Sequence, residues 1–133
     1  MYDLRSIKTF QSIEHPIKDA DGNPTGVVFT LAGPTHPQRK AAEHARQRKL
    51  IREAGKTGRL AQPDPAETEA ERPKLLAAMT LGWSGYGVNG QPVPFSVEAA
   101  EALYADPDLA WLTEQVDAAL ADRQLFTKPA SAS

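Results

Sequence analysis

The side chains that most often carry out acid–base or metal chemistry are few in this chain and widely spaced. Its three histidines are His15, His36 and His44. His15 precedes Pro16 in a predicted hairpin, and two helical turns, about 11–12 Å, separate His36 from His44. Both imidazoles could not easily bind one ion at that distance, and no His-Glu-x-x-His segment occurs. We therefore expect no metal site and interpret the histidines as surface residues.

Two glycine-containing segments match known motifs only by letter. Gly85-x-Gly87-x-x-Gly90 has the spacing of a dinucleotide-binding fingerprint, but that motif leaves a strand and opens a helix. Here Gly90 leads into Gln91-Pro92-Val93-Pro94, which predicts an extended segment. Around Ser84, a nucleophile elbow would need its closing glycine where Tyr86 stands. We therefore interpret both segments as parts of a glycine-rich bend.

The acidic residues and the absence of cysteine also argue against catalysis. Asp64, Glu67, Asp106 and Asp108 stand at predicted helix starts, where the helix dipole accounts for them. The chain has no cysteine, which excludes disulfides, thiol catalysis and zinc–thiolate sites. We expect a protein that is not an enzyme and binds no cofactor.

Length and hydropathy bound the class of protein. A chain of 133 residues can form one domain that buries about two thirds of its unfolded surface. No apolar run is long enough to cross a bilayer, and the first residues lack the apolar stretch of a signal peptide. The sequence predicts a cytoplasmic protein without membrane contact.

Charge is distributed unevenly along the chain. Residues 36–59 hold eight basic against two acidic side chains, a balance of +6, whereas residues 60–133 hold four against eleven, a balance of −7. This pattern has three interpretations: a solvated helix that pairs with acids of its own chain or of another copy, an arm that docks on a protein partner, or a nucleic-acid contact.

The first part of the chain predicts a β-hairpin. Residues 8–18 alternate unevenly between apolar and polar, residues 27–31 form a strand run, and residues 19–26 are dense in turn formers. Pro16 lacks an amide proton, so its strand should lie at a sheet edge or contain a bulge. Because a two-stranded hairpin is marginal in water, it must pack on helices or pair with strands of another copy.

The remaining residues predict helices. A basic helix runs from Pro37 to about residue 54, is stopped by Gly55 and Gly58, and has too few large apolar residues to be buried. Asp64-Pro65-Ala66-Glu67 predicts a second helix start, with Pro73 either kinking the helix or dividing it.

The predicted core is carried by the C-terminal helices. Leu76, Met79 and Trp83 share a helical face, which favours Trp83 as a core residue. Ser96 and Asp106 each cap a further helix, and Phe126 should fold back onto the core. The last helix carries the clearest apolar stripe, formed by Leu109, Leu112, Val116, Ala119 and Leu120.

The predicted fold class is therefore α+β, mainly α, with an N-terminal hairpin, a basic surface helix and a small C-terminal helical core. The corresponding segments are residues 1–34, 35–58 and 59–126, followed by a flexible tail over residues 127–133.

In this order, the elements resemble the tail assembly chaperones of long-tailed bacteriophages and prophages. One matching block runs from Gly22-Asn23-Pro24 through Val27-Val28-Phe29 to Gly33-Pro34 and on into Arg39-Lys40-Ala41-Ala42. The other runs from Gly82-Trp83-Ser84 through Pro92-Val93-Pro94-Phe95-Ser96 and Leu103-Tyr104 to Leu112, Gln115-Val116, Asp122 and Phe126. The two blocks span most of the chain apart from residues 55–72.

The resemblance implies a non-enzymatic factor in the host bacterial cytoplasm. Such a factor holds the tape-measure protein and helps recruit tail-tube subunits during virion assembly. Self-association of copies with opposite charges facing one another is compatible with that task.

Two other functions stay open at this point. One is a structural virion protein of the tail or head–tail joint, and the other is a small nucleic-acid-binding protein that uses the basic helix. The nucleic-acid alternative is disfavoured by the acidic overall charge and by the lack of aromatics among the basic residues. The candidate partner-binding residues are Val28, Phe29, Leu31, Arg39, Arg46, Arg48, Trp83 and Tyr86.

Overall fold

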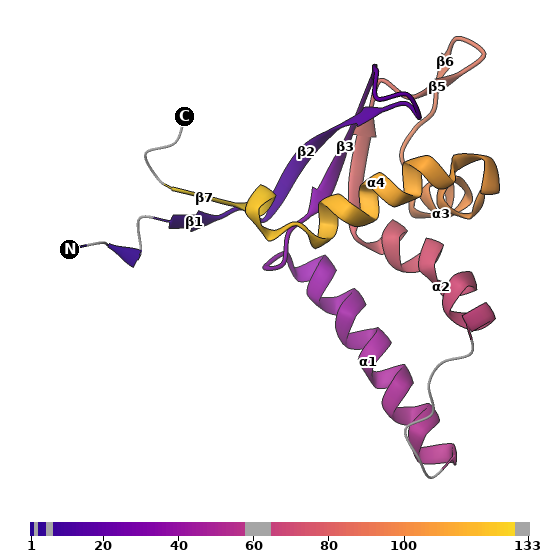
Figure 1. The fold of residues 1–133 in the computed structure, drawn as a ribbon. Helices are drawn as coiled ribbons and strands as arrows, with labels where there is room; N and C mark the ends of the chain where they lie inside the picture. The colour runs from indigo at the N-terminus through magenta and orange to yellow at the C-terminus, as the bar shows by residue number, and fades with distance from the viewer. Residues whose placement is uncertain (2, 5–6, 58–64, 130–133) are drawn as a thin grey trace.

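The computed structural model describes residues 1, 3–4, 7–57 and 65–129 and has the predicted architecture, α+β and mainly α (Figure 1). Its α-helices are α1 (Pro37–Thr57), α2 (Pro65–Ala78), α3 (Val97–Ala105) and α4 (Ala110–Ala121), and its short 3₁₀ helices are η2 (Pro107–Leu109) and η3 (Arg123–Phe126). Its strands are β1 (Ile7–Thr9), β2 (Ser12–Lys18), β3 (Pro24–Ala32), β4 (Thr80–Ser84), β5 (Gly87–Val88), β6 (Gln91–Pro92) and β7 (Thr127–Pro129).

The predicted hairpin is β2–β3, and the middle of the chain adds a third strand to it. The antiparallel order is β2-β3-β4, so that β3 is central. Asp19 closes the turn by accepting hydrogen bonds from the amides of Asp21 and Asn23, both at 2.9 Å. The prediction for Pro16 is confirmed, because β2 is an edge strand and its register with β3 shifts between Pro16 and Lys18.

The side chain of Gln115 in α4 bridges the end of β2. Its Nε2 donates to the carbonyl of Lys18 at 2.8 Å, and its Oε1 accepts from the amide of Lys18 at 3.1 Å. These bonds satisfy both backbone groups of one strand residue next to the bulge. They attach α4 to the sheet at that point.

The predicted helical face through Leu76, Met79 and Trp83 is wrong beyond Met79. Helix α2 includes Pro73 without dividing there and ends at Ala78, and Trp83 lies in β4 opposite Phe29. Pairing with β3 holds one edge of this segment by backbone hydrogen bonds, and the Trp83 ring packs against Phe29 at 5.5 Å between centroids.

The hydrophobic core is shared by the sheet and the helices. Phe29 and Leu31 of β3 are buried together with Leu76, Tyr104 and Val116. The core thus includes the predicted hairpin as well as the predicted helical segment. The predicted stripe of α4 is confirmed, with Leu112, Val116, Ala119 and Leu120 buried and Leu109 partly buried, and Phe126 folds onto it.

Several predicted boundaries shift. Ser96 caps α3 as predicted, accepting from the amide of Ala99 at 3.0 Å, whereas Asp106 caps the short η2 that precedes α4. Helix α1 continues through Gly55 to Thr57, so the predicted stop at Gly55 is wrong. Gly58 and Asp64, the other two predicted boundary residues, lie outside the described residues.

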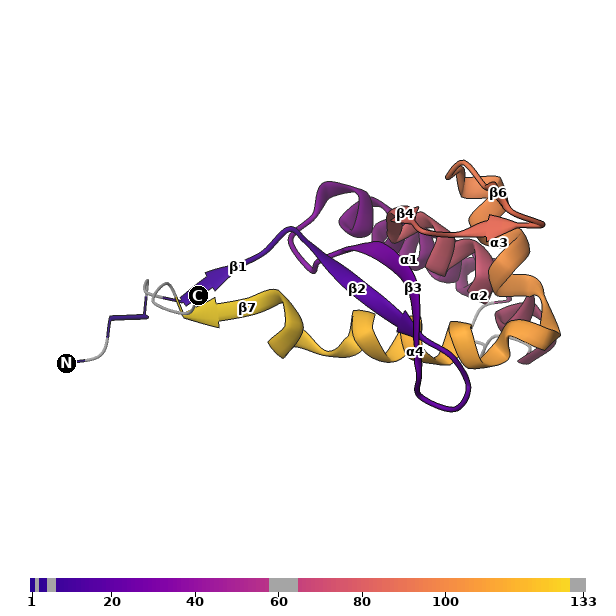
Figure 2. The same ribbon diagram turned by 90° about the horizontal axis from the view of Figure 1, so that it is seen from above.

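The ends of the chain form a separate two-stranded ribbon. β1 pairs antiparallel with β7, Ile7 opposite Pro129, and the ribbon extends from one end of the molecule (Figure 2). The predicted tail is therefore wrong for residues 127–129, which are held by backbone pairing, and residues 130–133 lie outside the described residues.

Arg39, in the first turn of α1, connects three parts of the fold. Its guanidinium donates from Nη1 to the carbonyl of Ala32 at 3.1 Å and from Nη2 to the carbonyl of Leu120 at 2.8 Å. It also lies over the ring of Phe126, 5.8 Å from the centroid. We call this meeting of β3, α4 and η3 at Arg39 the Arg39 junction.

Replacing Arg39 with alanine should lower the free energy of unfolding by about 2–4 kcal/mol, because two backbone carbonyls lose a charged donor. The free energy of unfolding of Arg39→Lys should lie between those of the parent and Arg39→Ala, since one ammonium group cannot reproduce both hydrogen bonds of the planar guanidinium. Urea denaturation measures both, with the exposed Arg48→Ala as the control, expected within about 0.5 kcal/mol of the parent. A loss at Arg39 no larger than at Arg48 would contradict the junction's structural role.

The buried contact between Tyr104 and Thr80 should make the free energy of unfolding fall at high pH. Burial raises the pKa of Tyr104 to about 12, opposed by the hydrogen bond between its hydroxyl and Thr80 Oγ1 at 2.7 Å. The unfolded tyrosine ionises near pH 10, so the stabilisation is complete below pH 10 and is lost as the pH rises toward 12. Between pH 9 and 11 the parent should lose about 1–2 kcal/mol more than Tyr104→Phe in urea denaturation. Parallel losses would show that the hydroxyl is not buried.

Candidate protein-docking groove between α1 and α2

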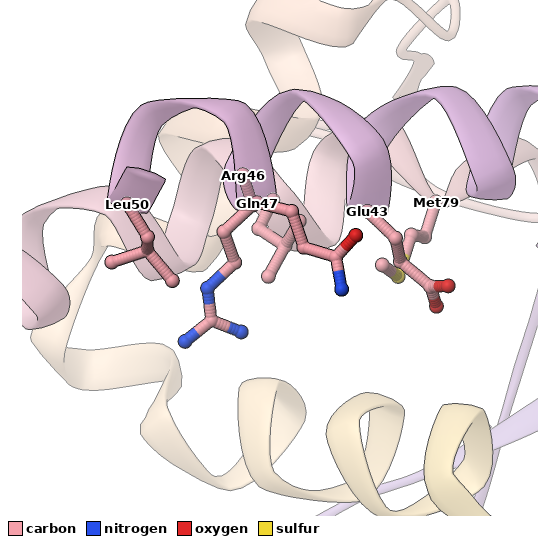
Figure 3. Close-up of a pocket in the computed structure, with 6 residues that line it drawn as sticks. Glu43, Arg46, Gln47, Leu50 and Met79 are labelled. Carbon is pink, nitrogen blue, oxygen red and sulfur yellow. The ribbon is translucent and has the colours of Figure 1, made fainter. Parts of the chain in front are cut away.

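A groove of about 340 Å³ lies between α1 and α2. Glu43, Arg46, Gln47 and Leu50 extend from α1 into the same open space, and Met79 approaches it from the end of α2 (Figure 3). Leu75 of α2 completes the lining. We call this feature the α1–α2 groove.

The groove lies between two contacts that connect the helices. Near the sheet, Gln38 Nε2 donates to the carbonyl of Ala78 at 2.6 Å. Farther along α1, Lys49 forms an ion pair with Glu71 of α2. Between these contacts α1 presents polar side chains where closely packed helices would interdigitate apolar ones, so the helices do not fill the space between them.

The groove combines an apolar floor with one charge that lacks an acidic partner. Met79 is buried, and Leu50 and Leu75 are partly buried. At the rim, Glu43 is already paired with Arg39 at 3.1 Å. Arg46 is exposed and pairs with no carboxylate among the described residues. A ligand of the groove would therefore meet apolar surface and a positive charge.

The predicted docking residues of the hairpin are mostly enclosed. Phe29 is 1% exposed and Leu31 is fully buried, so their prediction as partner contacts is wrong. The apolar side chains of β3 are covered by α2, α3 and α4 of the same chain, so the hairpin packs on helices, which is one of the two arrangements expected for it. Val28 is partly buried and pairs across the sheet with Pro16 and Ser84.

The three predicted arginines have different environments. Arg39 is committed to the Arg39 junction, with a side chain that is 12% exposed, so its prediction as a partner contact is wrong. Arg46 lines the groove. Arg48 is exposed on α1 outside the groove lining.

Trp83 and Tyr86 belong to a different part of the surface. Their rings stack at 5.3 Å, Phe95 meets Trp83 edge-on at 4.9 Å, and Trp83 Nε1 donates to the carbonyl of Val93 at 2.9 Å. Both aromatic residues are partly buried and support the β5–β6 turn, where Asn89 and Gly90 adopt positive φ. This cluster and the groove share no lining residue.

Sequence reasoning missed most of the groove. Glu43, Gln47 and Leu50 follow the i, i+4, i+7 spacing of one helical face, which places them together on α1. Nothing in the sequence pairs that face with Leu75 and Met79, because their meeting depends on how the two helices cross.

In the part of the chain that the structure describes, no group of three or more histidine, cysteine or acidic side chains is placed to hold a metal ion, and no buried polar side-chain atom lacks a hydrogen-bond partner. Burial, with a smaller contribution from Lys18, lowers the pKa of His15. No described helix is long and apolar enough to cross a bilayer.

Comparison of the chain with protein families, with curated proteins and with solved structures found no match.

The outer part of α1 should open more readily than the core. Beyond Leu50 the helix exposes Ile51 by 70%, and an isolated helical segment of this length is marginal in water. In hydrogen exchange, amides of residues 51–55 should therefore be protected on the order of a hundredfold less than those of residues 112–120 in α4. Equal protection would show that α1 is packed along its whole length.

Proposed function

We propose that this protein is a non-enzymatic tail assembly chaperone of a long-tailed bacteriophage or prophage. It holds the tape-measure protein and helps recruit tail-tube subunits in the host bacterial cytoplasm. The observation that carries this proposal is the α1–α2 groove, an apolar floor with a basic rim on a helix that extends away from the sheet (Figure 1). Such a surface suits a protein that binds segments of another chain.

The surroundings of the groove support a binding role. Lys40, Arg46, Arg48 and Arg52 of α1 are exposed and have no acidic partner among the described residues. Charges of one sign along an exposed helix promote encounter with a partner of opposite charge. The resemblance of this chain to tail assembly chaperones implies that this partner is the tape-measure protein.

One feature favours the alternative of a structural virion protein. Within the described residues the β1–β7 ribbon has two strands, and Phe10 and Leu125 near its base are 40% and 36% exposed. Unpaired strand edges beside apolar side chains can pair with another copy. The experiment must therefore distinguish a transient binder from a component of the particle.

Co-expression with the products of neighbouring genes should recover a very long, helix-rich partner bound to the tagged full-length protein. Mass spectrometry of purified particles should detect the protein at trace level or not at all, because a chaperone is released when assembly ends. Stoichiometric presence in particles would contradict the chaperone proposal and favour the virion component.

The tagged full-length protein, purified alone, tests the nucleic-acid alternative. We expect nonspecific duplex DNA to bind more weakly than micromolar at physiological salt. Micromolar affinity that falls steeply with increasing salt would instead favour a nucleic-acid function for α1.

A further inference from the structure

We infer that the α1–α2 groove receives an amphipathic helix whose apolar ridge is flanked by acidic residues, one of which pairs with Arg46. The inference rests on the proposed function and names the chemistry of the client segment. It concerns one surface, lined by Glu43, Arg46, Gln47, Leu50, Leu75 and Met79.

The shape of the lining favours a helix as the occupant. Both walls come from helices, and the α1 residues from Glu43 to Leu50 extend over about 10 Å of helix axis. A linear groove between two helices accepts side chains spaced three and four residues apart, which is the ridge of a third helix. No described residue of the lining belongs to a strand, so this part of the groove offers no sheet edge to an extended peptide.

The floor of the groove favours apolar anchors. Met79 is 7% exposed and has an adaptable thioether side chain, and Leu50 of α1 and Leu75 of α2 also line the groove. Covering the partly exposed leucines would remove apolar area from water. A polar helix would gain nothing from this contact.

The charge around the groove favours acidic residues beside those anchors. The carboxylate of Glu43 is engaged by Arg39 and the ammonium of Lys49 by Glu71, which leaves Arg46 as the unmatched charge of the lining. Arg48 and Arg52 add positive charge along the same helix. A carboxylate one turn from an apolar anchor could reach Arg46, whereas a lysine there would be repelled.

Two designed peptides of about three heptads test the inference directly. Both carry leucine at the core positions, and the flanking positions are glutamate in one and lysine in the other. Fluorescence anisotropy of each labelled peptide with the full-length protein gives its affinity. We expect the acidic peptide to bind at least about tenfold more tightly than the basic one.

Neighbouring residues of α1 provide matched control variants. Leu50→Gln should weaken the acidic peptide about tenfold, whereas Ile51→Gln, the same loss of apolar surface at an exposed site outside the groove, should weaken it less than about twofold. Arg46→Glu should likewise weaken it more than Arg48→Glu, although both change the charge of α1 equally. Arg46→Glu should also gain affinity for the basic peptide.

Three results would overturn the inference. The first is failure of the acidic peptide to bind, and the second is an equal effect of the two variants in either matched pair. The third is a self-associated chain, detected by sedimentation, that Leu50→Gln dissociates, because that result would assign the groove to a second copy. The proposed function fails separately. If the peptide results hold and no long helical partner is co-purified, the groove chemistry stands without the chaperone role. If that partner binds Leu50→Gln as well as Ile51→Gln, the chaperone role stands and the groove assignment falls.

Discussion

The Arg39 guanidinium is the contact on which the arrangement of α1 depends. It donates to the last carbonyl of β3 and to a carbonyl in the last turn of α4, while the adjacent Gln38 donates to the last carbonyl of α2. The C-terminal ends of three elements thus find donors in the first turn of one helix, where a cation is favoured by the negative end of the α4 dipole. These bonds fix the base of α1, and farther out the Lys49–Glu71 ion pair connects the helix to α2 as it extends away from the sheet (Figure 1).

This arrangement separates the residues that form the core from the exposed charged residues of outer α1. Among the described hydrophobic residues of α1, Ala42 alone packs around the core, and Arg39 at the base lies over the Phe126 ring, so the outer charges of α1 are not required for core packing. The core is closed instead by β3, α2, α3 and α4, with every buried polar side-chain atom in the described residues hydrogen-bonded. Substitutions along outer α1 should therefore leave the packing of the sheet and its helices unchanged.

Local chemistry made some elements predictable, and long-range pairing concealed others. Turn residues around Asp19, the missing amide proton of Pro16 and the capping hydroxyl of Ser96 act within a few residues, and each was recognised correctly. β4 was missed because Trp83 happens to fit a helical spacing, while its true partner, Phe29, lies far away in the sequence. The groove was missed for the same reason. The bond between Gln38 and Ala78 helps to hold its two walls together, and nothing in the sequence predicts contact between these two distant residues.

The β1–β7 ribbon brings the first and last described strands of the chain side by side. Ile7 lies opposite Pro129, so these two residues lie together at one end of the molecule, away from the α1–α2 groove (Figures 1 and 2). A short linker between residues 7 and 129, with the chain cut at the Asp19–Asn23 turn, would give a circular permutant with the same strand pairing. Domains fused directly to residues 7 and 129 would emerge together from that end of the described fold, which leaves the groove unobstructed when the protein is tethered to a surface.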